Sequence, residues 1–525
     1  MKREADIMLQ INDLTITHRK DLRIILDHFN LVLNYGDKAV IIGEEGNGKS
    51  TLMRFIYDPE LAEEYTECHG IRVLGKERTA YLPQELPEAD REKSVYEFFS
   101  EEESFWNQTP KELADYANRF LVEPGFFYRE QMMGTLSGGE KIKAQLMRLL
   151  ITEPTVLLLD EPSNDIDITT LELLEKIMNE WDFILLYVSH DETLIEETAN
   201  VIIHLEQVQR KTKCRYTVAR MPYRQYVEER LHNFEKQEQM ALNDRREKEI
   251  RDEKYRRIME KVDRAQSRVS RQSPGVAKNL KDKMHAVKSM GRRFEKEDEK
   301  MTEMPEMEEA IFFKLGKEES VIPAGKTVLK YELAELKKPF GEEILAKDIF
   351  LRIRGAEKVC IIGKNGAGKT TLLRLIAEKL SERSDLNVQY MPQNYEDMLD
   401  PEQTPVEFLD STGDKEERTR IRTYLGSLKY TVDEMEHPIR ELSGGQKAKV
   451  LLLKMSLSNA NVLILDEPTR NFSPLSGPVI RRMIRDFPGA VISISHDRKY
   501  IREVCDKVYE LTSEGLRLRD RNELT

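Results

Sequence analysis

Cysteine is scarce in this 525-residue chain, and its distribution excludes several classes of protein. The four cysteines, Cys68, Cys214, Cys360 and Cys505, lie far apart, and no two of them stand at metal-ligand or redox spacing. A disulfide framework, a zinc site and an iron–sulfur site are therefore not supported. We expect a protein of the reducing cytoplasm.

Long hydrophobic runs are also missing. Runs such as Phe183 to Val188 and Val462 to Leu465 have the length of buried strands, far below the ~20 residues that span a bilayer. The polar start, Met1 to Asp6, does not resemble a secretory signal. With 39% apolar and 34% charged residues, the composition is that of a folded protein with a very polar surface. We expect two or three domains and no membrane span.

An internal repeat dominates what the sequence does contain. The segments Leu136 to Glu140, Leu157 to Pro162 and Ser189 to Asp191 recur as Leu442 to Gln446, Leu463 to Pro468 and Ser495 to Asp497, each time 306 residues later. Independent chance matches would not keep this register, so the chain contains a duplicated domain. A glycine-rich loop, Gly43 to Ser50, recurs as Gly363 to Thr370 after 320 residues. The first copy thus has 14 extra residues between this loop and its Leu-Ser-Gly-Gly segment, most of them before Gln84.

Each glycine-rich loop has the pattern G-x-x-x-x-G-K-[S/T] between an apolar strand-like run and a helix-compatible stretch, which predicts a phosphate cradle. Lys49 and Lys369 would reach the β- and γ-phosphates, and Ser50 and Thr370 would ligate Mg²⁺. The candidate ATP-binding residues of the two loops are Gly43, Glu44, Glu45, Gly46, Asn47, Gly48, Lys49, Ser50 and Thr51, and Gly363, Lys364, Asn365, Gly366, Ala367, Gly368, Lys369, Thr370 and Thr371.

Carboxylates and histidines follow the apolar runs in both copies. Asp160 and Asp466 end such runs, where they would hold the Mg²⁺ water shell, and Glu161 and Glu467 come next as candidates to orient or deprotonate the attacking water. His190 and His496 each end a further apolar run about thirty residues later, where we expect a contact with the γ-phosphate. The matched copies make helix capping a weaker interpretation of these acids.

These motifs together resemble those of the ATP-binding cassette superfamily. The resemblance implies an α/β fold with two tandem P-loop domains, in which the signature segment of one cassette caps the ATP held by the other through a helix N-terminus. It also implies that Gln84 and Gln393 sense Mg²⁺ and the γ-phosphate. The expected signature residues are Ser137, Gly138, Gly139 and Glu140, facing the second loop, and Ser443, Gly444, Gly445 and Gln446, facing the first.

Two positions depart from the pattern of that superfamily. Ser473 stands where an aspartate usually reaches across the pair of cassettes, so we expect the site built on Lys49 to hydrolyse ATP less well. Phe340 is a candidate to stack on adenine in the second copy, whereas the aligned residues of the first copy, 21–23, are not aromatic.

The segment between the copies, residues 220–308, has few glycines and apolar residues at helical spacing, which predicts two long helices folded back on each other. A turn is expected at Ser270 to Gly275. Between Lys254 and Arg293 there are thirteen basic and three acidic residues, +10 in a chain of net charge −13. Such a basic tip on an acidic body favours insertion among phosphates. The candidate RNA-binding residues are Arg264, Arg268, Arg271, Lys278 and Lys281.

Tandem cassettes joined by a basic helical linker resemble the ABC-F proteins. The resemblance implies a cytoplasmic ATPase that uses ATP and Mg²⁺, binds the ribosomal tRNA exit site as a monomer, and extends its linker toward the peptidyl-transferase centre, near large-subunit rRNA and the peptidyl-site tRNA. The expected domains are residues 1–219, 220–308 and 309–525.

Several functions remain open at this point. The lack of an inserted arm after Gln84 and the extended linker favour antibiotic ribosomal protection over a housekeeping translation factor. A fused ATPase subunit of an importer or exporter predicts a short, unremarkable connector, and a non-hydrolysing scaffold has no need of both Glu161 and Glu467.

Overall fold

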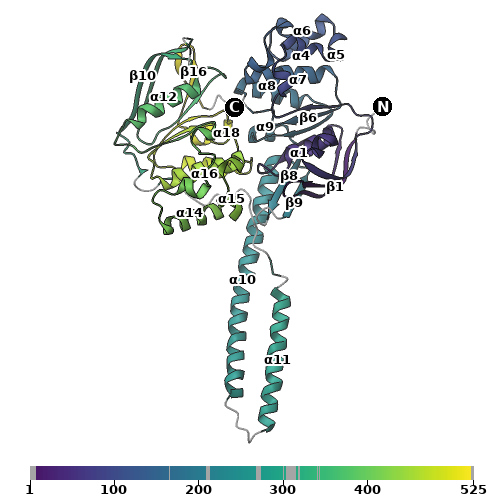
Figure 1. Cartoon of the computed structure of the whole chain (residues 1–525), viewed down its shortest axis with the longest axis vertical. Helices are drawn as coiled ribbons and strands as arrows, with labels where there is room; N and C mark the ends of the chain where they lie inside the picture. The colour runs from purple at the N-terminus through teal and green to yellow at the C-terminus, as the bar shows by residue number, and fades with distance from the viewer. Residues whose placement is uncertain are drawn as a thin grey trace. The chain divides into compact units, whose positions relative to one another are not determined.

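The computed structural model describes residues 8–164, 166–208, 213–267, 274–298, 301–302, 315–316, 320–339, 341 and 343–521. The chain forms two compact units (Figure 1). One comprises residues 1–223 with 308–525, and the other residues 224–307.

The first cassette is built on a six-stranded sheet with the order β5-β6-β7-β3-β8-β9. All neighbouring strands are parallel except β8 and β9. The strands β6 and β7 are buried along their whole length, as expected for parallel strands covered on both faces. The six strands are β3 (Lys38–Ile42), β5 (Thr79–Leu82), β6 (Val156–Asp160), β7 (Ile184–Val188), β8 (Val201–Val208) and β9 (Lys213–Ala219).

A second sheet of this cassette is antiparallel, with the order β2-β1-β4. Its strand β4 accounts for part of the extra length that the sequence shows before Gln84, because the described second copy has only a two-stranded sheet in the corresponding place. The strands are β1 (Met8–His18), β2 (Ile24–Asn34) and β4 (Thr66–Val73).

Helices cover the sheets of the first cassette (Figure 1). They are α1 (Lys49–Tyr57), α2 (Pro59–Glu63), α3 (Glu88–Arg91), α4 (Val95–Ser100), α5 (Glu103–Trp106), α6 (Pro110–Arg119), α7 (Gly138–Ile151), α8 (Ile168–Asn179) and α9 (Glu192–Thr198).

The second cassette repeats the same topology, with the order β13-β14-β15-β12-β16-β17. This confirms the predicted duplication and the α/β fold with two tandem cassettes. Its strands are β10 (Thr327–Lys337), β11 (Ile344–Arg354), β12 (Lys358–Ile362), β13 (Val388–Met391), β14 (Val462–Asp466), β15 (Ala490–Ile494), β16 (Lys507–Thr512) and β17 (Gly515–Arg519). Its helices are α12 (Lys369–Ser381), α13 (Pro405–Leu409), α14 (Lys415–Ser427), α15 (Val432–Glu436), α16 (Gly444–Leu457), α17 (Gly477–Arg485) and α18 (Arg498–Val504).

The unit of residues 224–307 is a helical hairpin, as the sequence predicts. Its helices α10 (Tyr223–Ser267) and α11 (Pro274–Asp298) run side by side (Figure 1). The rings of Tyr255 and Phe294 meet edge to face at 5.8 Å. Gly291 allows this approach, because a Cβ atom there would lie 2.5 Å from the Tyr255 hydroxyl.

One expectation for the hairpin needs correction, the end of its turn. The turn is shorter at its end than expected, because α11 already begins at Pro274 and includes Gly275. Proline suits the first position of a helix, where its missing N–H would be unpaired anyway.

Candidate nucleotide site

Four adjacent strand ends bring the predicted residues of the first cassette together. In the sheet order β5-β6-β7-β3, the ends of these strands lead into Gln84, Asp160, His190 and the glycine-rich loop. Carboxyl ends of parallel strands meet at one sheet edge, where α/β proteins bind their ligands. The ends of β13, β14, β15 and β12 place the matching residues of the second cassette in the same way.

The first loop turns directly into helix α1. Gly48 has φ 86°, and a Cβ atom at this residue would lie 2.1 Å from Ile25. The Lys49 ammonium is buried and donates to the carbonyl oxygens of Gly43 at 2.9 Å and Glu44 at 3.1 Å. The loop thus holds its lysine inside the turn, facing the space that phosphates take in such loops.

Oxygen donors suited to Mg²⁺ lie beside this loop. The Ser50 hydroxyl donates to Asp160 at 3.1 Å, and the Tyr81 hydroxyl donates to the other carboxylate oxygen at 3.2 Å. Burial raises the pKa of Asp160 to about 6. Among the described residues there is no cluster of three or more His, Cys, Asp and Glu side chains that could hold a metal. The oxygens of Ser50 and Asp160 suit Mg²⁺, which takes one or two protein oxygens and completes its shell with phosphates and water.

Glu161 is the centre of a polar cluster. Its carboxylate accepts hydrogen bonds from Gln84 at 3.2 Å and from Asn164, and it lies 3.2 Å from His190 Nε2. Burial opposes the charge of Glu161, but His190 and Lys49 outweigh it and lower its pKa to about 2. His190 Nδ1 in turn lies 2.6 Å from the carbonyl oxygen of Phe472, in the second cassette.

The second cassette holds the same residues in a different electrostatic state. Burial and the neighbouring Asp466 raise the pKa of Glu467 to about 8. Burial and the charge of Lys369 lower the pKa of His496 to about 3, and its Nδ1 has no partner among the described residues. His496 Nε2 is 3.6 Å from Glu467, a longer separation than in the first cassette.

The signature segments cap two helices of 14 residues each. Ser137 and Ser443 are the N-caps of α7 and α16, each in a capping box with the side chain three residues later. The side chains of Glu140 and Gln446, predicted to bind ATP, are therefore bonded to their own caps. The amides of Gly139 and Gly445 lie in the first turns of these helices, where backbone N–H groups lack partners within the helix.

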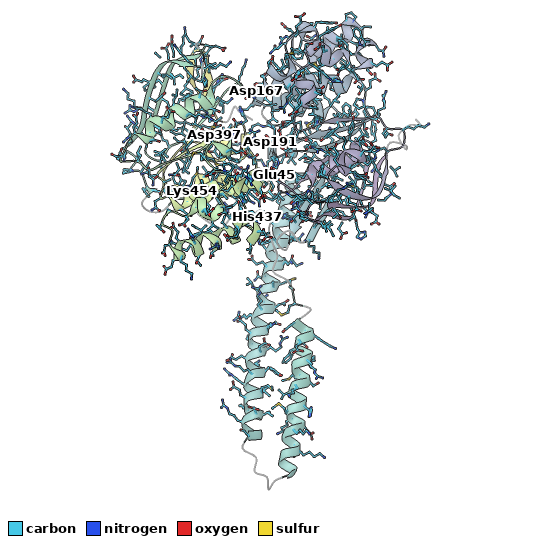
Figure 2. All side chains as sticks on the ribbon, in the orientation of Figure 1. Glu45, Asp167, Asp191, Asp397, His437 and Lys454 are labelled. Carbon is cyan, nitrogen blue, oxygen red and sulfur yellow. The ribbon has the colours of Figure 1, made fainter. Side chains whose placement is uncertain are left out.

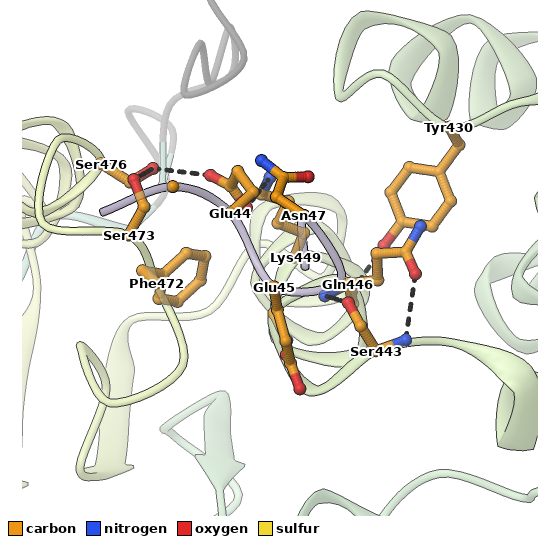
Figure 3. Close-up of polar contacts among 12 residues, drawn as sticks. Glu44, Glu45, Asn47, Tyr430, Ser443, Gln446, Lys449, Phe472, Ser473 and Ser476 are labelled. Atoms are coloured by element: carbon orange, nitrogen blue, oxygen red, sulfur yellow. Dashed lines mark hydrogen bonds and ion pairs between the residues drawn. The ribbon is translucent and has the colours of Figure 1, made fainter. Parts of the chain in front are cut away.

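Each signature faces the glycine-rich loop of the other cassette, as the resemblance implies. The Gly445 amide donates to Glu45 of the first loop at 2.7 Å. Gly138 of the first signature lines a cavity of about 940 Å³ together with Lys369 and Thr370 of the second loop. Gln393, Thr371 and His496 also line this cavity. Figure 3 shows Glu45 of the first loop with Ser443 and Gln446 of the second signature.

Some predicted residues lie elsewhere or outside the described residues. The Asn47 amide donates to the carbonyl oxygen of Leu205, and Thr51 accepts from Tyr65, so both side chains face the protein. Phe340, Arg268 and Arg271 lie outside the described residues. Arg264, Lys278 and Lys281 are exposed on the hairpin. Figure 2 shows side chains projecting along both of its helices.

Several contacts of the site were not predicted, three of them by residues that the sequence analysis did not single out as site residues. They are the bonds of Tyr81 to Asp160, of Asn164 to Glu161 and of Lys449 to Glu44. The recurrence of Tyr81 as Tyr390, three residues before each glutamine, is a signal that could have pointed to the first of them.

The cassettes match known proteins over most of the chain. A family profile described as ABC transporter matches residues 26–164 and 346–470. The ribosome protection protein VmlR of Bacillus subtilis (strain 168) is 29% identical over 521 residues, which cover 94% of this chain and 85% of that protein. ABC transporter F family member 4 of Dictyostelium discoideum is 26% identical, over 94% of this chain and 44% of that protein.

A solved structure shares the arrangement of both cassettes. The archaeal ribosome recycling factor aABCE1, in complex with the ribosomal stalk protein aP1, has a TM-score of 0.56 at 18% identity, covering 96% of this chain and 89% of that one. At this identity the likeness concerns the fold alone. No helix in the described part of the chain is long and apolar enough to cross a membrane.

Proposed function

Because the chain belongs to the ABC transporter family of ATP-binding cassette proteins, we propose that it is an ABC-F protein, a cytoplasmic ATPase that acts on the ribosome. It binds the tRNA exit site and extends its basic hairpin toward the peptidyl-transferase centre, beside large-subunit rRNA and the peptidyl-site tRNA. Its role is antibiotic ribosomal protection. The observation that carries this proposal is the +10 stretch of the hairpin in an otherwise acidic chain.

The ATPase part of the proposal rests on the residues at the strand ends. Lys49 and Lys369 bind the phosphates of two ATP molecules, while Ser50 with Asp160 and Thr370 with Asp466 hold Mg²⁺. When bound, Mg²⁺ neutralises charge on the β- and γ-phosphates. Glu161 and Glu467 orient the attacking water and accept its proton, and the two histidines position these carboxylates.

The ribosomal part rests on charge and on the relatives. Arg264, Lys278 and Lys281 are exposed, so phosphate oxygens can reach them. Arg264 pairs with Glu260 of its own helix at 3.2 Å, and such an exposed pair contributes little that would oppose an exchange for phosphate. VmlR is named a ribosome protection protein, which favours the protection role over that of a housekeeping translation factor. The helical hairpin disfavours a fused transporter subunit, which needs no long basic projection.

Sedimentation with ribosomes tests the proposal. In the double variant Glu161→Gln with Glu467→Gln, ATP binds but water activation is lost, so the closed chain should accumulate on ribosomes. We expect this variant to pellet with 70S ribosomes in the presence of Mg-ATP and to stay in the supernatant without nucleotide. Absence of pelleting in both conditions contradicts a ribosomal role. Peptide synthesis in the presence of antibiotics that bind the peptidyl-transferase centre, with the unmodified chain added, then separates protection from a housekeeping role.

A further inference from the structure

The first glycine-rich loop carries two glutamates where the second has other residues. Glu44 and Glu45 correspond, at the offset of 320, to Lys364 and Asn365. Phosphate-binding loops bind anions, so two carboxylates within one of them oppose its ordinary function. The structure shows what these carboxylates contact.

Glu44 binds two residues of the second cassette. Its side chain is buried, and it lies 3.1 Å from the ammonium of Lys449, which is buried as well. The Ser476 hydroxyl donates to the other carboxylate oxygen at 3.0 Å (Figure 3). Both oxygens of Glu44 thus have partners, as a buried carboxylate requires.

Glu45 binds the helix N-terminus that forms the signature of the second cassette. Its carboxylate accepts the Gly445 N–H at 2.7 Å, in the first turn of α16. A carboxylate at this point has the same chemistry as a phosphate oxygen, because both place negative charge on free amides at the positive end of the helix. Glu45 therefore occupies an anion position of α16.

In the other composite site, formed by the loop at Lys369 and the signature that begins at Ser137, the two positions equivalent to Glu44 and Lys449 are both lysines. Lys143 corresponds to Lys449 at the offset of 306, and it faces a loop that carries Lys364 instead of Glu44. The pKa of Lys143 is lowered by burial and, in part, by the charge of Lys364. The Gly139 amide corresponds to that of Gly445, and the loop across the cavity from this signature carries Asn365 where the first loop carries Glu45. Two lysines that repel each other hold this site together only when an anion lies between them.

We propose that Glu44 and Glu45 form a carboxylate latch, which keeps the first composite site closed without nucleotide and competes with ATP for the Gly445 amide. ATP binding at Lys49 must release Glu45 from α16 and add a polyphosphate next to two carboxylates. The second composite site has no latch, and the ATP bound at Lys369 controls its closure. The cassettes therefore stay in contact at the first site when no nucleotide is bound, whereas the second site closes when ATP binds at Lys369 and opens when the nucleotide leaves.

Hydrogen exchange of the nucleotide-free chain tests the latch without any activity assay. In the unmodified chain the Gly445 amide should exchange more slowly than the Gly139 amide, its counterpart in the same molecule. In Glu45→Ala the exchange of the segment 443–447 should rise by about tenfold or more, since a hydrogen bond to a charged acceptor is lost. In Glu45→Gln, which keeps an acceptor but no charge, the rise should be smaller. Glu172→Gln removes an exposed carboxylate of α8 and should change nothing.

Unchanged exchange of segment 443–447 in Glu45→Ala overturns the proposal. A general loss of structure cannot imitate the expected result, because the segment 137–141 serves as an internal reference. Glu45→Asn adds a second safeguard, since the second loop carries Asn365 at this position in the same kind of turn.

Nucleotide binding tests the competition, and this arm rests on the proposed ATP binding. Equilibrium dialysis with radiolabelled ATP, in the Glu161→Gln and Glu467→Gln background, should detect one tight site and one weaker site. Adding Glu45→Asn should strengthen the weaker site by about tenfold, because its anion position is freed. If no ATP binds at all, the proposed function fails while the exchange result still stands. If both sites are equally tight before the change, the latch does not compete with ATP.

Discussion

At the scale of single residues, the two candidate bases differ in charge state although their sequences match. Glu161 faces His190 and has a pKa lowered to about 2, whereas Glu467 is buried beside Asp466 and has a pKa raised to about 8. A general base must be deprotonated to accept a proton. At pH 7 Glu161 is therefore ready for this role, and most Glu467 side chains carry a proton.

This difference predicts opposite pH profiles for two single variants. In Glu161→Gln only Glu467 remains, so turnover should rise about tenfold per unit below pH 8 and level off above it. In Glu467→Gln only Glu161 remains, and turnover should be flat from pH 6 to 9. His496, with its pKa near 3, stays neutral throughout and adds no step. Phosphate release at saturating Mg-ATP measures both profiles.

The same variants compare the two sites directly. Above pH 8 both bases are ionised, so the remaining difference comes from Ser473 and from the latch at the first site. Glu467→Gln should then slow turnover more than Glu161→Gln. Identical rates above pH 8 and identical profiles below it would remove the asymmetry.

Sequence motifs single out residues that the structure brings together, but they do not show the bonds among these residues. The motif around Lys49, the carboxylate Asp160 and the cap Ser443 are each recognisable from their neighbours in the chain. The bond from Gly445 to Glu45 joins residues 400 positions apart, so it depends on how the cassettes face each other. The pKa of Glu467 depends on burial from all sides, which a linear pattern does not contain.

At the scale of elements, the hairpin is held by a few specific contacts between α10 and α11. Arg251 pairs with Asp298 and Glu297, and its guanidinium lies 4.7 Å from the ring of Phe294. Most other side chains of α10 are exposed. Periodicity predicted the two helices, but it could not show that Ile258 remains 40% exposed, since burial depends on how closely the two helices pack.

Gly291 provides a test of the pairing of these helices. Gly291→Val would place side-chain atoms where the Tyr255 hydroxyl lies, so α10 and α11 should separate at this level. We expect faster proteolysis and faster hydrogen exchange in residues 245–298, with the cassettes unaffected. Ser289→Val introduces the same β-branched side chain at an exposed position of the same helix and should leave protection intact. Equal protection in both variants would show that the hairpin does not depend on this contact.

At the scale of the whole molecule, two ion pairs join the cassettes, and equivalent positions of the two cassettes carry opposite charges. Arg481 binds Glu192 and Arg498 binds Glu175, each at 2.8 Å. At the offset of 306, Arg481 corresponds to Glu175 and Arg498 to Glu192. A pair of two first cassettes would therefore place glutamate against glutamate, and a pair of two second cassettes would place arginine against arginine. These charges favour pairing of a first cassette with a second cassette over pairing of like cassettes.

A double-mutant cycle measures one of these pairs. Glu175→Gln leaves the buried Arg498 unpaired and should lower the free energy of unfolding by about 3 kcal/mol. Adding Arg498→Met should cost less than the sum of the two single changes, by about 1 kcal/mol or more. The exposed pair Arg119 with Glu180, at 3.0 Å, is the control and should show a coupling near zero. Additive effects at Glu175 and Arg498 would show that the pair does not bind the cassettes together.

The last prediction concerns the charge of the hairpin against that of the rest of the chain. If its basic residues neutralise ribosomal phosphates, each contact releases counterions, and affinity for ribosomes should fall steeply with salt. Changing Arg264, Arg268, Arg271, Lys278 and Lys281 together to Gln should reduce the slope of log affinity against log salt by about four units. The ATPase activity of the free chain should survive, since the strand ends that carry the site belong to the other compact unit.

The control neutralises five exposed bases of the cassettes, Lys76, Lys111, Lys347, Arg352 and Arg420. This control changes net charge equally, so a loss of slope confined to the hairpin variant separates contact from long-range attraction. A hairpin variant that sediments with ribosomes as tightly as the unmodified chain over the same salt range would show that the hairpin is a solvated spacer.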